Sequence, residues 1–157
     1  MKVNVSGITL IELIVVIIII SILASFVYPQ YKNYKGKSVV SAALSVLSSV
    51  KDKHLEHYAE NGFFEKKVIQ YSDKIKVLYH NDSECKHSIY PCLPESYGAT
   101  TCVSAIINEP VLEVVNPQIA LAGTEVDGHM VWECIACNIY SHRTIPEKYL
   151  PASCHYP

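Results

Sequence analysis

The first sixty residues carry two hydrophobic patterns that meet near Pro29. From Ile8 to Val27 the only strongly polar side chain is Glu12, whereas beyond Pro29 apolar residues recur at helical spacing, at Val40, Ala43, Leu44, Leu47 and Val50. The first pattern predicts a helix that is apolar on nearly every side, and about twenty such residues span roughly 30 Å, the hydrocarbon thickness of a bilayer. The second pattern predicts an amphipathic helix that packs one face on a core.

The rest of the chain has strand-like segments rather than further helical periodicity. Asn61-Gly62 is a helix stop signal, so a single helix is expected from Ile8 to about Glu60. Strand composition is found in residues 74–79, 101–107 and 129–137, with a weaker candidate at residues 111–115 and an irregular connection expected over residues 63–95. The expected fold class is therefore α+β, with one long helix packed on an antiparallel β-sheet.

Composition excludes some classes of protein but does not identify the function. The chain has 157 residues, a formal net charge of −2 and 18% charged residues. These values exclude a disordered chain and a strongly basic nucleic-acid-binding protein. The length suits one globular core with an appendage.

Six cysteines, all downstream of the apolar segment, indicate disulfides formed in an oxidising compartment. Cys134 and Cys137 lie three apart on a predicted strand, so their side chains point to opposite faces and should not bond each other. A zinc site or buried cytosolic thiols would be the alternative, but the membrane-like segment argues against a cytosolic protein. The Cys-x-x-Cys spacing alone does not predict redox catalysis, because no helix N-terminus is readable there.

Glu12 needs a partner, because an acid in a bilayer costs a few kcal/mol even on lenient insertion scales. A secretory signal peptide fits poorly, since the segment is too long and has a weak cleavage site, and a plain anchor leaves Glu12 unexplained. A cut between Gly7 and Ile8 would create an α-amino group about one helical turn away. That ammonium could pair with Glu12 within one chain or between staggered chains, where the pair would set the register.

The segment "GITLIELIVVIIIISILASFVYPQYKNY" resembles the N-terminus of type IV pilins, through the glycine, the T-L-I-E-L motif and Pro29-Gln30-Tyr31. The resemblance implies a leader at residues 1–7 that prepilin peptidase removes, N-methylation of Ile8, and pairing of Glu12 with that terminus on a neighbouring subunit. Ile8 replaces the usual Phe, which favours a minor pilin. Ser21 replaces a common glycine in the segment that, in the family, melts before Pro29 during assembly.

The C-terminal segment "VWECIACNIYSHRTIPEKYLPASC" resembles the disulfide-bounded loop of type IVa pilins, which implies a Cys134–Cys154 bond. Cys85, Cys92, Cys102 and Cys137 are expected to form disulfides whose pairing the sequence leaves open. The implied layout is a leader at residues 1–7, a transmembrane and assembly helix at 8–28 and a globular head at 29–157. His54 and His57 are expected on a solvated helix face, so no metal site is predicted.

The resemblance implies a structural pilus subunit, not an enzyme, with no cofactor. The implied partners are other pilin subunits, prepilin peptidase and an inner-membrane assembly platform, with DNA or a host surface as further partners of a pilus. The expected location is the inner membrane before assembly and the bacterial surface afterwards. A DNA-binding minor pilin is one alternative, with His142, Arg143 and Lys148 as candidate contacts, although acids are interleaved with the basic residues. A type II secretion pseudopilin and a simple anchored periplasmic domain are the others.

Overall fold

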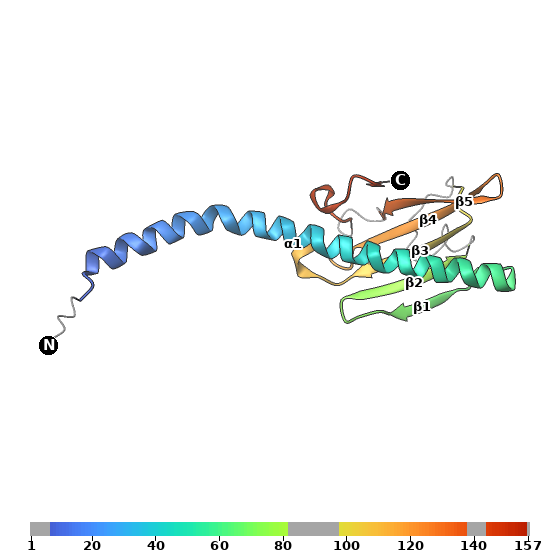
Figure 1. The fold of residues 1–157 in the computed structure, drawn as a ribbon, viewed down its shortest axis with the longest axis horizontal. Helices are drawn as coiled ribbons and strands as arrows, with labels where there is room; N and C mark the ends of the chain where they lie inside the picture. The colour runs from blue at the N-terminus through green and yellow to red at the C-terminus, as the bar shows by residue number, and fades with distance from the viewer. Residues whose placement is uncertain (1–6, 82–97, 138–143, 157) are drawn as a thin grey trace, which may run out of the picture. The chain divides into compact units, whose positions relative to one another are not determined.

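The computed structural model describes residues 7–81, 98–137 and 144–156 (Figure 1). The chain divides into two compact units, Met1–Tyr34 and Lys35–Pro157. The elements, in chain order, are the helix α1 (Leu10–Asn61), the strands β1 (Lys67–Gln70), β2 (Ile75–Asn81) and β3 (Thr101–Ile107), the 3-10 helix η1 (Pro110–Leu112), the strands β4 (Gln118–Val126) and β5 (His129–Ala136), the 3-10 helix η2 (Glu147–Tyr149) and the strand β6 (Cys154–His155).

Helix α1 is continuous over 52 residues and has Pro29 in its interior. It begins at Leu10 rather than at Ile8, because Thr9 caps its N-terminus, as described below. It ends at Asn61, and Gly62 follows with a left-handed backbone, at a φ of 78°. A glycine adopts this conformation without the steric cost of a Cβ, which explains why the helix stops where the Asn-Gly pair predicts.

The six strands form one sheet in the order β1-β2-β3-β4-β5-β6. Every neighbouring pair is antiparallel except β5 and β6, which are parallel. The predicted antiparallel sheet is therefore confirmed with one parallel addition at its edge. The β4–β5 turn lies at Asp127 and Gly128, both with positive φ, a residue pair that two-residue hairpin turns favour.

Two sequence-based expectations about strands were wrong, and one further strand was not predicted. Residues 111–115 do not form a strand, because η1 begins at Pro110 and Glu113 ends it in a left-handed conformation, at a φ of 62°. Residues 67–70, expected to be irregular, form the edge strand β1. Gln118–Val126 forms the nine-residue strand β4, which the sequence analysis did not predict.

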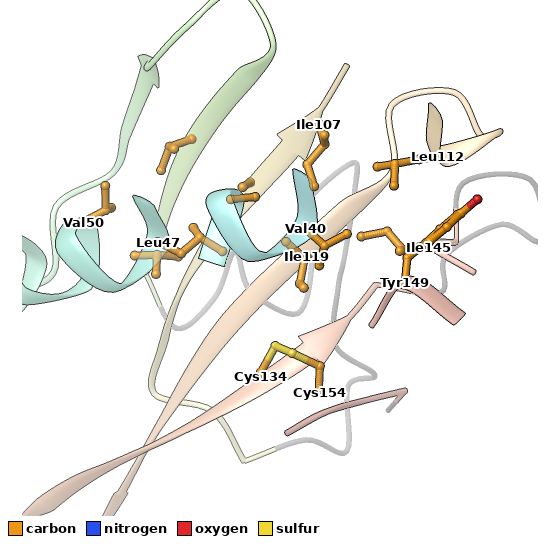
Figure 2. Packing of buried hydrophobic residues seen from close by; sticks show 14 of the residues in the cluster. Val40, Leu47, Val50, Ile107, Leu112, Ile119, Cys134, Ile145, Tyr149 and Cys154 are labelled. Carbon is orange, nitrogen blue, oxygen red and sulfur yellow. A yellow bond between two sulfur atoms is a disulfide. The ribbon is translucent and has the colours of Figure 1, made fainter. Parts of the chain in front are cut away.

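At the centre of the sheet both faces are buried, because every residue of β3 except Ile106 is buried and alternate residues of a strand point to opposite faces. On the face that carries α1, Val103, Ile107 and Ile119 pack with Val40 and Leu47 of the helix (Figure 2). A second cluster of small and apolar residues consists of Ala99, Cys102, Ala120, Ala122, Ile135 and Cys137. The amphipathic stripe predicted for residues 40–50 is therefore the surface that packs the helix on the sheet. Figure 1 shows the second half of α1 lying over the sheet.

The C-terminal segment is fixed to the same helix by a close contact. Tyr149 in η2 is 1% exposed and packs against the backbone of Gly36 in α1. A Cβ added at Gly36 would lie 2.5 Å from Cδ1 and Cε1 of the Tyr149 ring, far inside contact distance. Gly36 is therefore required by the approach of this ring, not by backbone conformation.

Candidate assembly site

The first half of α1 leaves its apolar side chains without partners among the residues that the structure describes. All residues from 7 to 31 are exposed, and the helix is long and apolar enough to cross a membrane. Ile11, Val16 and Leu23 illustrate the pattern, with 71%, 51% and 60% of their side-chain surfaces exposed. A continuous apolar surface of this size requires lipid or other protein helices as its surroundings.

Glu12 is held at the start of α1 by a reciprocal capping arrangement with Thr9. The Thr9 backbone N–H and the Thr9 hydroxyl both donate to Glu12 Oε2, each at 2.8 Å. In return, the Glu12 backbone N–H donates to Thr9 Oγ1 at 3.4 Å. This is a capping box, in which residues at the N-cap and the third helical position satisfy each other's polar groups.

The capping box changes the interpretation of Glu12. A cleaved terminus is not the only partner for Glu12, because Thr9 of the same chain supplies two donors. The signal was present in the sequence as Thr-x-x-Glu immediately before an apolar run. Both of these bonds use Oε2, so Oε1 has no hydrogen bond in the described part of the chain and can accept one from another group.

The two serine hydroxyls of this half are satisfied within the helix. The Ser21 hydroxyl donates to the Ile17 carbonyl at 2.7 Å, and the Ser25 hydroxyl donates to the Ile22 carbonyl at 2.6 Å. Pro29 has no backbone N–H, so the carbonyl four residues earlier lacks its usual intrahelical donor. Pro29 thus marks a weak point in the hydrogen-bond ladder, although α1 continues through it.

In the globular unit, a disulfide joins Cys134 of β5 to Cys154 of β6, the pair that the family resemblance implies (Figure 2). The two residues are also register partners in the parallel β5–β6 pairing, with Cα atoms 4.5 Å apart. The bond therefore attaches the C-terminal segment directly to the edge of the sheet.

Two further cysteines are also disulfide-bonded. Cys102 and Cys137 each form a disulfide and belong to the cluster on the face opposite Cys134. Cys134 and Cys137 therefore lie on opposite faces and do not form a redox pair with each other. Cys85 and Cys92 lie outside the described residues.

Of the candidate DNA contacts, the structure describes Lys148 alone. Its Nζ lies 3.5 Å from Glu113 Oε2 and 4.7 Å from the centroid of the Tyr149 ring. An acid therefore compensates its charge, which does not favour a basic stripe at this position. His142 and Arg143 lie outside the described residues.

The expectation of a solvated face was wrong for His54, which is 1% exposed on the core side of α1. The Thr101 hydroxyl donates to the His80 carbonyl at 2.9 Å, so its oxygen accepts from His54 Nε2–H, also at 2.9 Å. Burial lowers the pKa of His54 to about 4 and keeps the ring neutral. His57 is half-buried. No group of three metal-ligating side chains is present among the residues that the structure describes.

Comparison with known proteins places this arrangement in one family. Residues 2–28 match the prokaryotic N-terminal methylation motif, and residues 36–155 match the pilin (bacterial filament) family. No curated protein sequence matches the chain significantly. The pilin match covers more than half of the chain, and the methylation motif covers its apolar start. The chain therefore belongs to the type IV pilin family, whose members are structural subunits that assemble into polymers and are not enzymes.

Proposed function

We propose that this chain is a prepilin that becomes a subunit of a type IV pilus. Prepilin peptidase cuts between Gly7 and Ile8 and methylates the new terminus, and residues 8–28 hold the precursor in the inner membrane. An assembly platform then moves the subunit into a surface filament. The observation that carries this proposal is the exposed apolar half of α1, which bears one acid, Glu12, with a free carboxylate oxygen.

Glu12 sets the register between neighbouring helices in this mechanism. Oε2 remains bonded to Thr9, which keeps the first turn capped, while Oε1 accepts from the methylated ammonium of Ile8 on a neighbouring subunit. Because an unpaired acid is costly among apolar helices, staggers that leave Glu12 without this partner are disfavoured. Packing of the exposed apolar side chains supplies the cohesion.

The head supports assignment to a pilus rather than to a type II secretion system. The Cys134–Cys154 bond closes the C-terminal segment, as in the type IVa pilins that this region resembles. A disulfide also suits a subunit displayed outside the cell, where no cytosolic reductant maintains free thiols. Adhesion, twitching motility and DNA uptake are the activities of pili that the head would serve.

The Glu12→Gln variant tests the mechanism. Glutamine keeps an oxygen that can accept from Thr9, so the cap persists, but the charge that attracts a neighbouring ammonium is lost. We expect a precursor that is cut normally, measured by its mass, but is at least about tenfold depleted in sheared fibres, since charged pairs contribute about 1.5–3 kcal/mol. Ser21→Ala is the matched control, because Ser21 bonds only to its own helix. Normal incorporation of Glu12→Gln would exclude a register role for the charge.

A further inference from the structure

A groove lies between the last turns of α1 and the edge strand β1, with a volume of about 330 Å³. Val50 on the helix, Ile69 on β1, and Val77 and Tyr79 on β2 give it an apolar lining. All lie in the globular unit, so the groove belongs to one compact body. Its volume is at the lower end of the range for small-molecule sites, which favours a small ligand.

Charged side chains line the same groove. Lys67 lies 3.8 Å from Glu65, so that acid offsets the charge of that lysine. Lys53, also in the lining, has no ion pair within the described part of the chain. With one acid and two lysines, the groove has a net positive charge beside an apolar lining. This combination is complementary to an anion with an apolar body.

The lining also contains an unsatisfied polar atom. His54 is 1% exposed, and its Nε2–H is already used by the Thr101 hydroxyl. Its Nδ1 is a buried acceptor with no hydrogen-bond partner among the described residues. A carboxylate has no proton to donate to this atom, so an anion in the groove would be recognised by Lys53 and not by His54.

Aromatic rings gather around His54 and favour a flat ligand. The His54 ring stacks on Phe64 at 4.9 Å between centroids and is tilted against Tyr79 at 5.1 Å. Tyr71, 58% exposed, also contributes to the lining. Phe64 does not line the groove, but Tyr71 and Tyr79 do, and these two rings can contact a ligand ring in stacked or edge-to-face arrangements.

We propose that the α1–β1 groove binds a small aromatic carboxylate from the surroundings of the head. Its carboxylate pairs with Lys53, and its ring lies on the apolar lining near Tyr79 and Ile69. The groove is too small and too apolar for a nucleic-acid backbone, which requires an extended cationic track. Binding at this site does not depend on filament assembly, so its failure would leave the proposed function intact.

The test uses 4-fluorobenzoate as the probe and the detergent-solubilised full-length chain, with ¹⁹F NMR titration against protein-free micelles. We expect saturable binding that Lys53→Gln weakens about tenfold, as befits loss of a charged partner. Lys37→Gln is the matched control, because Lys37 is an exposed lysine of the same helix that does not line the groove. Equal weakening by both variants, or no effect of either, would overturn the proposal.

Two further measurements locate the ligand and identify what is recognised. Ile69→Trp adds bulk on the half-buried face of an edge strand, and we expect it to abolish binding while the thermal unfolding transition stays cooperative. Unchanged binding to a folded Ile69→Trp protein would place the site elsewhere and refute the proposal. The neutral isostere 4-fluorobenzyl alcohol should bind at least about tenfold more weakly than 4-fluorobenzoate. Equal binding of the two probes would show that Lys53 recognises no charge.

Discussion

The two halves of α1 share one backbone conformation but differ in their surroundings. Residues 7–31 are all exposed, whereas Gly36, Val40, Ala43, Leu47, Val50 and His54 are buried on the face that packs on the sheet. The two halves therefore differ in function because they pack against different partners, not because their helical conformations differ. The second half finds its partners within the chain, and the first half must find them in lipid or in other subunits.

Truncating one buried and one exposed apolar side chain gives the sharpest contrast. Leu47 is fully buried between α1 and the sheet, so Leu47→Ala should lower the free energy of unfolding of the head by about 2–5 kcal/mol. Val16→Ala should leave the head unchanged, because Val16 is 51% exposed and lies in the other unit.

Fluorescence of Trp132, the sole tryptophan, reports on the head alone and follows both unfolding transitions in detergent. A destabilisation by Val16→Ala equal to that of Leu47→Ala would show that the two halves are not energetically separate.

The Cys134–Cys154 disulfide should make the next largest contribution to the free energy of unfolding of the head. Its sequence separation of 20 corresponds to about 3 kcal/mol in the chain-entropy account. The double variant Cys134→Ser/Cys154→Ser leaves no odd thiol, and its chemical unfolding midpoint should fall accordingly. Ser48→Ala, an exposed change in α1, provides the control. An unchanged midpoint would mean that β6 holds its place without the bond.

His54 makes the second half of α1 sensitive to acid. Its pKa falls from 6.5 to about 4 on folding because burial disfavours the charged ring. The fold therefore favours the neutral form of the ring. The resulting contribution to the free energy of unfolding is fully present above pH 6.5 and is lost as the pH falls through 4.

The shift corresponds to about 3 kcal/mol at full protonation. A series of unfolding curves between pH 7 and pH 4 should show this loss, and His54→Gln should flatten the slope while His57→Gln should not. Identical slopes for all three proteins would contradict the assigned burial of His54.

Substitution of Gly36 is expected to give the smallest loss of stability. A methyl group at this position overlaps the ring of Tyr149, so Gly36→Ala should cost about 1–3 kcal/mol through displacement of η2, despite the better helix propensity of alanine. Ser38→Ala, two residues along on the exposed side, should be neutral or slightly stabilising. If Gly36→Ala raises the melting temperature instead, the packing of Tyr149 on α1 is not as close as described.

Hydrophobic periodicity predicted the long helix, its division into an apolar and an amphipathic half, and its end near Glu60, because these features depend on local composition. The apolar stripe predicted from the sequence ends at Val50, one turn too early. His54 continues the buried face, but a histidine is not counted as apolar in a hydrophobic pattern. The network with Thr101 and the His80 carbonyl that satisfies Nε2 comes from strands far along the chain. Local patterns do not contain such partners.

The strands were predicted less well, for reasons that differ from one strand to the next. β4 contains Ala120, Ala122 and Gly123, whose strand propensities are low, but it lies between β3 and β5, where small residues fit. β6 is two residues long and is placed by a disulfide and by pairing with β5. Residues 111–115 look like a strand by composition, although Pro110 starts a 3-10 turn there.

At the assembly site, the sequence identified Glu12 as the anomaly and identified a cleaved terminus as its partner. The Thr-x-x-Glu spacing is also the sequence signal of a capping box, which gives Glu12 a partner at the start of its own helix. The structure adds that Oε2 accepts two hydrogen bonds from Thr9, which leaves Oε1 for the partner that we propose. The cut at Gly7 and the methylation of Ile8 remain predictions that the methylation-motif match over residues 2–28 supports.

Mass spectrometry of sheared surface fibres tests the central claim most directly. The account predicts a peptide that begins with N-methylated Ile8 and continues through Glu12, with no fibre-associated peptide containing Met1. Fibres that lack this chain, together with membranes that retain it with Met1 intact, would contradict the account and would leave the apolar half of α1 as a simple anchor.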